Sequence, residues 1–280
     1  MRRAAIFAAL ALLPPLLQAP AMAQSLGITA GEDPIEIEAD QGIEWQRGNQ
    51  LYIARGNARA RQLDRTVDAD SLTAHYRPTS DGRNQVYRLD ADGNVRITSP
   101  RETATGDHAV YDVLGAVLVI TGRAVSLKTA ADLVTATQAI EYHERARYAV
   151  ARGDAVAVRE NQRVRADVLV GHFVDLPANT GGGSEMRRME AFGNVRIDTA
   201  TDIVFADHGD YDLRSGIVKL DGNVRITRAD TQLNGERAEV NLNTGVSRLL
   251  SGSGPGGGRV QGLLVPGQPP PTATTPPPAR

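Results

Sequence analysis

Histidines and acidic side chains recur along this chain at spacings that could bring them together. The histidines are His75, His108, His143, His172 and His208. Most of them lie close to an acidic residue that opens an apolar alternation. Stacked strands could gather such histidines into a metal site. Exposed histidines on the polar face of strands would give the same pattern. We favour that second interpretation and predict no metal site.

The acidic residues follow a schedule. Each lies fourteen residues after a glycine, and the matching position in one further copy is Thr137, fifteen residues after Gly122. Paired carboxylates could act as general acid and base, but a catalytic pair should stand out from a repeat. We therefore interpret them as carboxylates that cap a turn or a bulge. The scheduled acidic residues are Asp70, Asp107, Asp167, Asp207 and Glu236.

Other catalytic signatures are missing from the sequence. It has no G-x-S-x-G elbow, no H-E-x-x-H pair and no phosphate loop. The absence of cysteine excludes disulfides, thiolate metal sites and a cysteine nucleophile. We predict no catalytic residue and no cofactor. The net charge of −2 shows no broad basic field for nucleic acid. Nearly all positive charge is arginine, which reflects either a GC-rich genome or forks for phosphate groups on an anionic ligand.

The scheduled glycines belong to a repeat. The string GNVRI begins at Gly93, Gly193 and Gly222, and weaker copies begin at Gly56, Gly122 and Gly153. Glycine in a strand marks a bulge or a bend, and asparagine tolerates the same backbone angles. The extra residue before Thr137 also predicts a β-bulge.

Each repeat indicates two strands with one buried face. Val95 and Ile97 point one way while Asn94 and Arg96 point the other, and no stretch has a convincing helical period. We predict an all-β fold of about six two-strand repeats, antiparallel from about Asp33 to Leu250. The buried face is rich in small and branched aliphatic residues. Such a sheet could close as a packed core or stay open as a gutter, and periodicity alone does not separate the two.

The ends of the chain differ from the repeats. Arg2 and Arg3, an apolar stretch and Ala21-Met22-Ala23 have the order of a secretory signal peptide. We expect Sec export and cleavage after Ala23, then a leader over 24–32, the repeat domain over 33–266 and a disordered Pro-rich tail over 267–280. No later segment is long and apolar enough to cross a membrane.

Several short motifs, in order and spacing, resemble the LptA/OstA-like family of periplasmic lipopolysaccharide-transport bridge proteins. They are the stretch Pro34 to Gln41, the Gly56-Asn57 and Asp68-Ala69-Asp70 motifs, and the end from Gly258 to Gln268. The resemblance covers about residues 33–268. It implies an open-ended, V-shaped antiparallel β-jellyroll in the periplasm whose inner face carries the acyl chains of lipid A. The candidate groove residues are Ile35, Ile37, Val95, Ile97, Val195, Ile197, Val224 and Ile226.

The same resemblance implies partners. Protomers of the family stack head to tail, first strand to last, and join related proteins, an inner-membrane-anchored jellyroll and an outer-membrane barrel. The chain departs from the family in length, with extra repeats between about residues 115 and 190, so one chain could do the work of more than one stacked protomer. The candidate edge residues are Ile35, Ile37, Val260, Leu263, Leu264 and Val265.

Two other classes of function fit a β-repeat. One is a parallel β-helix enzyme acting on polysaccharide, which would need a carboxylate cluster or a calcium site that interrupts the repeat. The other is a structural or adhesive protein. Lipid bound to the folded domain would separate the transport hypothesis from both.

Overall fold

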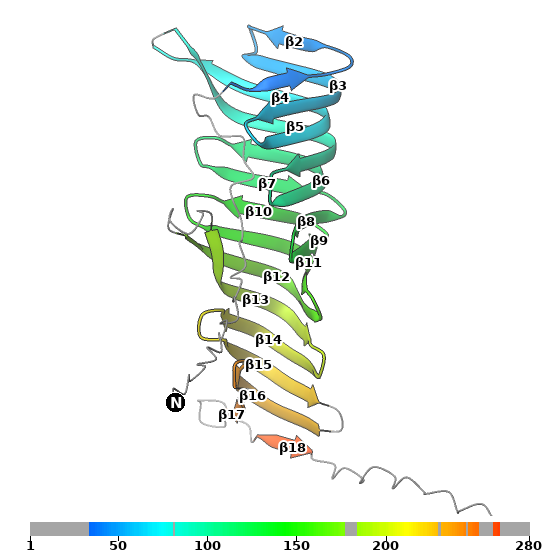
Figure 1. Cartoon of the computed structure of the whole chain (residues 1–280), viewed down its shortest axis with the longest axis vertical. Helices are drawn as coiled ribbons and strands as arrows, with labels where there is room; N and C mark the ends of the chain where they lie inside the picture. The colour runs from blue at the N-terminus through cyan, green and yellow to red at the C-terminus, as the bar shows by residue number, and fades with distance from the viewer. Residues whose placement is uncertain are drawn as a thin grey trace, which may run out of the picture.

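The computed structural model describes residues 34–80, 82–176, 184–228, 231–244, 246–251 and 260–263. Within these ranges all regular structure is β-strand, and the strands form one sheet. Figure 1 shows them stacked in chain order along an elongated molecule. Every pairing is antiparallel. The predicted all-β antiparallel fold is therefore confirmed, and a parallel β-helix is excluded.

The sheet begins with two short strands that share one long neighbour. These are β1 (Glu36–Glu38) and β2 (Ile43–Gln46), which pair with the two halves of β3 (Leu51–Gln62). No described strand covers the outer edge of β1 or β2. The next long strands are β4 (Arg65–Pro78), β5 (Asn84–Thr98) and β6 (Glu102–Asp112).

In the middle of the molecule, two long strands are each broken into two pieces. The first is β7 (Val117–Thr121) with β8 (Val125–Thr129), and the second is β9 (Asp132–Ala136) with β10 (Ala139–His143). Strand β7 pairs with β10, and β8 pairs with β9. Between these pairings residues 122–124 face residues 137–138. The strand made of β7 and β8 therefore carries one extra residue here, which confirms the bulge predicted between Gly122 and Thr137.

The second half repeats the arrangement of the first. Two short strands again end it, β17 (Val246–Leu250) and β18 (Gln261–Leu263), which pair with the two halves of β16 (Thr231–Asn241). The long strands between are β11 (Tyr148–Arg159), β12 (Gln162–Asp175), β13 (Ser184–Asp198), β14 (Asp202–Asp212) and β15 (Ile217–Arg228).

The Gly-Asn pairs bend the long strands at their middles. Gly93 and Asn94 have φ angles of 78° and 48°, in the left-handed region that glycine and asparagine tolerate best. At this point residues 69–70 of β4 face residues 93–95 of β5, so β5 carries one extra residue. The asparagine side chain then donates a hydrogen bond to the scheduled carboxylate of the preceding strand. These bonds are Asn94 to Asp70 (3.0 Å), Asn194 to Asp167 (2.9 Å) and Asn223 to Asp207 (2.7 Å).

Two more carboxylates do the same work with other partners. Asp40 accepts a bond from the Asn57 side chain (2.7 Å), and Asp107 accepts one from the backbone N–H of Arg123 (3.0 Å). The interpretation of the scheduled aspartates as bulge caps is thus confirmed for Asp70, Asp107, Asp167 and Asp207.

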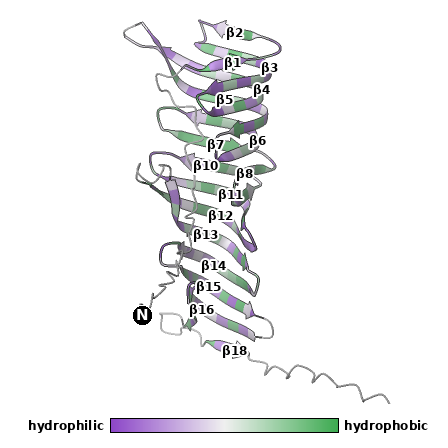
Figure 2. Ribbon diagram, in the orientation of Figure 1, coloured by the Kyte–Doolittle hydropathy of each residue, from purple (hydrophilic) through white to green (hydrophobic). Residues whose placement is uncertain are grey.

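The interior is built from alternate residues of the strands. Figure 2 shows hydrophobic and hydrophilic residues alternating along them. The inner face holds a continuous cluster of buried alanine and branched aliphatic side chains from β3 to β16. Its most deeply buried branched side chains are about 1% exposed: Val95, Ile120, Val125, Val195, Leu220 and Val224.

Several predicted segments lie outside the described residues. They are the signal peptide (1–23), the leader (24–32) and the tail (267–280), together with the outermost residues of the predicted domain. The predicted last strand, Val260 to Val265, is represented by β18, so Leu264 and Val265 also fall outside.

Candidate functional site

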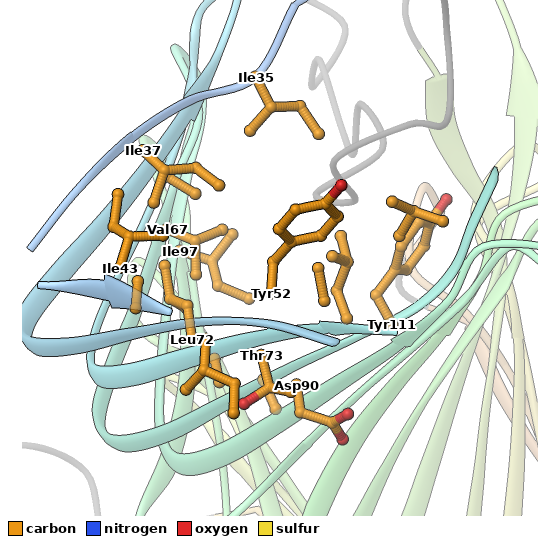
Figure 3. A pocket seen from close by; sticks show the side chains of 18 of the residues that line it. Ile35, Ile37, Ile43, Tyr52, Val67, Leu72, Thr73, Asp90, Ile97 and Tyr111 are labelled. Atoms are coloured by element: carbon orange, nitrogen blue, oxygen red, sulfur yellow. The ribbon is translucent and has the colours of Figure 1, made fainter. Parts of the chain in front are cut away.

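An apolar hollow lies at the end of the sheet where β1 and β2 begin. We call it the N-terminal chamber; it encloses about 300 Å³. Figure 3 shows the strands curving around the side chains that line it. Its lining is aliphatic apart from Tyr52, Tyr111, Thr73 and Asp90. The remaining lining residues are Ile35, Ile37, Ile43, Ile53, Ala54, Ala60, Val67, Leu72, Ala74, Val86, Leu89, Ala91, Ile97, Ala109 and Leu118.

Strand register places these side chains in two rows. One row crosses the first arm of the sheet, where Ile37 faces Ala60, Ala60 faces Val67, and Val67 faces Ile97. The other row crosses the second arm and runs through Ile43, Ala54, Leu72, Ala91 and Ala109. The bulges separate the two arms of each strand. The chamber is the space between the rows.

Small side chains make the chamber hollow. Alanines at Ala54, Ala60, Ala91 and Ala109 are buried, while the larger Leu72 and Leu89 are half-buried. Large side chains at the alanine positions would fill the space as a packed core does. A volume of about 300 Å³ is at the lower end of small-molecule sites. The arrangement can therefore take up apolar ligand groups.

Two polar groups at the chamber, on Asp90 and Tyr111, are already paired. Asp90 is 8% exposed, receives two charge-assisted bonds from Arg88 and lies 2.8 Å from His75 Nε2. The Tyr111 hydroxyl donates to Glu144 (3.3 Å), and burial raises the pKa of Tyr111 above its usual value. Neither group is free to drive chemistry. They mark the polar rim of an otherwise apolar space.

The predicted groove residues divide between this chamber and the packed interior. Ile35, Ile37 and Ile97 line the chamber. Val95, Val195 and Val224 are 1% exposed and Ile226 is 6% exposed, within the core cluster. Ile197 is half-buried against the same cluster.

Sequence reasoning missed most of the lining on the second arm, such as Leu72 and Leu89. Their period-2 alternation continues through β4 and β5, and this signal could have found them. The predicted edge residues lie at both ends of the sheet: Ile35 and Ile37 at β1, and Val260 beside β18, 43% exposed. Leu263 is placed by its pairing with Gln232.

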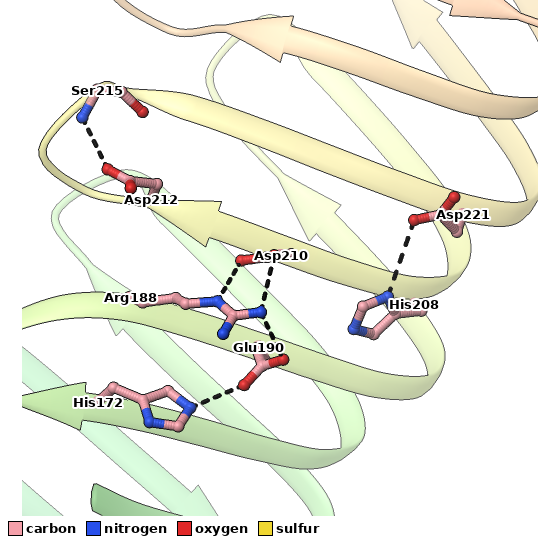
Figure 4. A network of polar contacts seen from close by, with 8 residues as sticks. All are labelled: His172, Arg188, Glu190, His208, Asp210, Asp212, Ser215 and Asp221. Atoms are coloured by element: carbon pink, nitrogen blue, oxygen red, sulfur yellow. Dashed lines mark hydrogen bonds and ion pairs between the residues drawn. The ribbon is translucent and has the colours of Figure 1, made fainter. Parts of the chain in front are cut away.

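The outer face carries histidines and arginines paired with carboxylates. We expected the five histidines to be exposed, but all five are half-buried. Each lies within 4 Å of an Asp or Glu oxygen. Figure 4 shows two of these pairs, His172 with Glu190 and His208 with Asp221. Arg188 bridges Glu190 and Asp210, and it holds the pKa of Asp210 below its usual range. Arginines that are already paired with carboxylates are less able to bind phosphate groups of an anionic ligand, which was one explanation of the high arginine content.

No metal centre is evident in the described ranges. No group of three or more His, Asp or Glu side chains there is arranged to hold an ion. The same residues include no helix long and apolar enough to cross a bilayer.

Comparison with known proteins identifies the family. The family model of the LptA/(LptD N-terminal domain) LPS transport protein matches residues 36–148 and again residues 133–246. The chain belongs to this family. The resemblance inferred from the sequence is thereby confirmed, and this LptA/LptD-type chain matches its family model twice.

Individual relatives are distant. An uncharacterized protein, R00383, of Rhizobium meliloti (strain 1021) is 24% identical over 102 residues, 35% of this chain. The chain spans 54% of that relative's length. The crystal structure of LptH, the LptA homologous periplasmic component of the conserved lipopolysaccharide transport device from Pseudomonas aeruginosa, is 10% identical. That match covers 85% of this chain and 99% of LptH, with a TM-score of 0.22.

Proposed function

We propose that this LptA/LptD-type protein carries lipopolysaccharide between the two membranes by holding lipid A acyl chains in its apolar interior. The observation that carries the proposal is the N-terminal chamber. It is a hollow of about 300 Å³ with a mostly aliphatic lining at an open end of the sheet. Family membership supports the same class of ligand. No cofactor and no catalytic residue take part.

The energetics explain why such a chamber is needed. Burying one CH₂ group is worth about 0.8 kcal/mol, so exposing a chain of a dozen such groups costs on the order of 10 kcal/mol. Lipid A carries several chains. An apolar chamber removes this penalty because the chains move between apolar surroundings. The protein supplies a path, and the energy for directional movement comes from a partner.

The open edges suggest how the path is extended. Among the described residues no strand pairs with the outer edges of β1 and β2, and such edges pair readily with another strand. We propose that copies stack head to tail, with Ile35 and Ile37 at one edge and Val260, Leu263, Leu264 and Val265 at the other. An inner-membrane-anchored jellyroll and an outer-membrane barrel would cap the two ends. We therefore propose a periplasmic location, which the predicted signal peptide also supports.

Binding of purified lipopolysaccharide tests the proposal. Ile37→Asp puts a carboxylate on a half-buried lining position, and it should weaken binding at least tenfold because ionised groups are costly among acyl chains. Leu133→Asp is the matched control, since Leu133 is 40% exposed and does not line the chamber. Its affinity should match that of the unmodified protein. Thermal unfolding must show both variants folded. Equal affinities for the two variants would overturn the proposal.

A further inference from the structure

A second apolar hollow lies in the middle of the molecule. We call it the central chamber; it encloses about 150 Å³ between β6 and β14. Its lining is again mostly aliphatic, with two methionines that can adapt their shape to a ligand. Representative lining residues are Val134, Ala157, Val164, Leu169, Met186 and Met189.

The central chamber repeats the N-terminal chamber position by position. Eleven of its lining residues, on β9 to β12, lie 97 places after a lining residue of the first chamber, and three on β13 and β14 lie 100 places after one. The change from 97 to 100 falls at the connection between β12 and β13, three residues longer than that between β4 and β5. Examples of these pairs are Ile37 with Val134, Ala60 with Ala157, Val67 with Val164, Leu72 with Leu169, Val86 with Met186, Leu89 with Met189, and Tyr111 with Tyr211.

Polar contacts on the strands follow the same offsets. In the first half, His75 and Arg88 both bind Asp90. In the second half, His172 and Arg188 both bind Glu190, as Figure 4 shows. The register shift after His75 also recurs after His172. Together with the two family-model matches, these repeats indicate two family units joined in one continuous sheet.

The two chambers are separate hollows. From β3 to β11 the sheet advances by six strands (β4, β5, β6, β7, β10 and β11). At about 4.8 Å per strand this is a distance of roughly 29 Å. Ile120 on β7 and Val125 on β8 are 1% exposed and line neither chamber. A packed layer therefore lies between the two hollows.

Polar side chains also line the central chamber, namely Glu102, Thr129, Asp132, Arg159 and Gln162. Glu102 lines it and is 4% exposed, and within the described residues its Oε1 has no hydrogen-bond partner. A buried acceptor without a donor is costly. An amide N–H or hydroxyl of a bound lipid could supply that donor, which is a reason to expect a ligand here.

We infer that the central chamber is a second acyl-chain site, so that one chain carries two lipid A molecules in series. This inference rests on the proposed function of the first chamber and adds a second site to it. Movement along the protein then proceeds in steps of one unit, across the layer formed by Ile120 and Val125.

Photo-crosslinking at equivalent positions tests the inference on the intact protein. A benzoylphenylalanine residue replaces either Ile37 or Val134, both half-buried, and the protein is loaded with purified lipid A before irradiation. A third protein carries the label at Glu38, exposed on the opposite face of β1, as the control. Native mass spectrometry of the unlabelled protein counts the lipids bound. The inference predicts crosslinks from both Ile37 and Val134, none from Glu38, and up to two lipids per chain.

Other outcomes overturn one or both proposals. Crosslinks from Ile37 alone, or a maximum of one lipid per chain, would overturn the second site and leave the proposed function standing. Crosslinks from Val134 alone would remove the N-terminal chamber, on which the proposed function rests, and would also contradict two sites in series. Crosslinks from neither position would overturn both. Ala157→Phe, which fills the central chamber, should lower the maximum from two lipids to one, and Ala60→Phe should do the same at the first chamber. Two lipids on both filled variants would also contradict the inference.

Discussion

The side-chain amide of Asn94 donates to both carboxylate oxygens of Asp70, at 3.1 Å and 3.0 Å, across the bulge between β4 and β5. Asn94 itself has a positive φ of 48°. The contact therefore fixes the residue whose backbone bends the strand. Because the bulge separates the two arms that face each other across the N-terminal chamber, this exposed polar pair shapes the apolar interior.

Replacing Gly93 by alanine should destabilise the protein more than a positive φ alone explains. A Cβ there would lie 2.7 Å from Asp70 Cγ and 2.9 Å from its Cβ, so Asp70 must move and its bond with Asn94 is lost. We expect a cost of about 2 kcal/mol, measured by urea unfolding. Gly82→Ala is the control, because Gly82 has a similar φ of 80° and nothing within 4 Å. That variant should lose only about 1 kcal/mol. Equal losses would contradict this account of the bulge.

Asn94→Ala should be less stable than Asn94→Gly. Both variants lose the bond to Asp70, but only alanine is strained at a φ of 48°. The expected difference in unfolding free energy is about 1 kcal/mol. If alanine proves as stable as glycine at this position, the left-handed backbone is not what selects asparagine.

The repeat made much of the fold predictable. The repeated Gly-Asn pairs and the repeated acidic residues form the two sides of one contact, since Asp70 and Asn94 meet across neighbouring strands. Period-2 alternation predicted one buried face, and that face is buried. Pairing along the sheet follows chain order except at the broken strands β7 to β10. The extra residue before Thr137 was the only feature of the sequence that indicated an irregularity there.

The site was less predictable, because alternation does not tell a packed residue from one that lines a hollow. Val95 and Ile97 share a face two residues apart, yet only Ile97 lines the N-terminal chamber. The difference depends on the neighbours across the sheet. Ile97 lies in a row with Val67 and Ala60, whereas Val95 faces Gly106 beside the bulge. Ile226 is likewise a core residue, so an aspartate there would test stability rather than lipid binding.

Stability should fall as the pH rises through the titration of Glu102. Burial raises the pKa of Glu102 from 4.5 to about 7, against the opposing effect of Arg65 and Arg101. The other charged groups that line the same chamber, Asp132 and Arg159, are paired with each other. Between these two pKa values the unfolded chain ionises while the folded protein holds its proton. The folded state therefore loses free energy as the pH rises through this window, by up to about 3 kcal/mol.

Glu102→Gln removes this titration. Urea unfolding at pH 4.5 and pH 8, about the ends of the window, measures this. The unfolding free energy of the variant should rise relative to that of the original protein as the pH rises. A difference between the two proteins that is the same at both pH values would show that Glu102 ionises freely in the fold.

Trp45 should report the loading of the N-terminal chamber. It is the single tryptophan of the chain, is 48% exposed, and stacks on Tyr52 with ring centroids 5.6 Å apart. Tyr52 lines the chamber, so acyl chains there would displace water near the indole. We expect the emission to shift to shorter wavelength on titration with lipopolysaccharide. Core oligosaccharide without acyl chains should leave it unchanged, and a shift with that control would point to binding on the outer face.

The central claim is that acyl chains lie against the inner face of the sheet. Lipid A with a photoreactive diazirine at the end of an acyl chain tests it without altering the protein, if the labelled residues are then mapped by mass spectrometry. We predict adducts on chamber-lining residues such as Ile37, Val67 and Leu72. Adducts confined to outward residues of β3 and β4, such as Arg59, Arg61 and Asp68, would contradict the account.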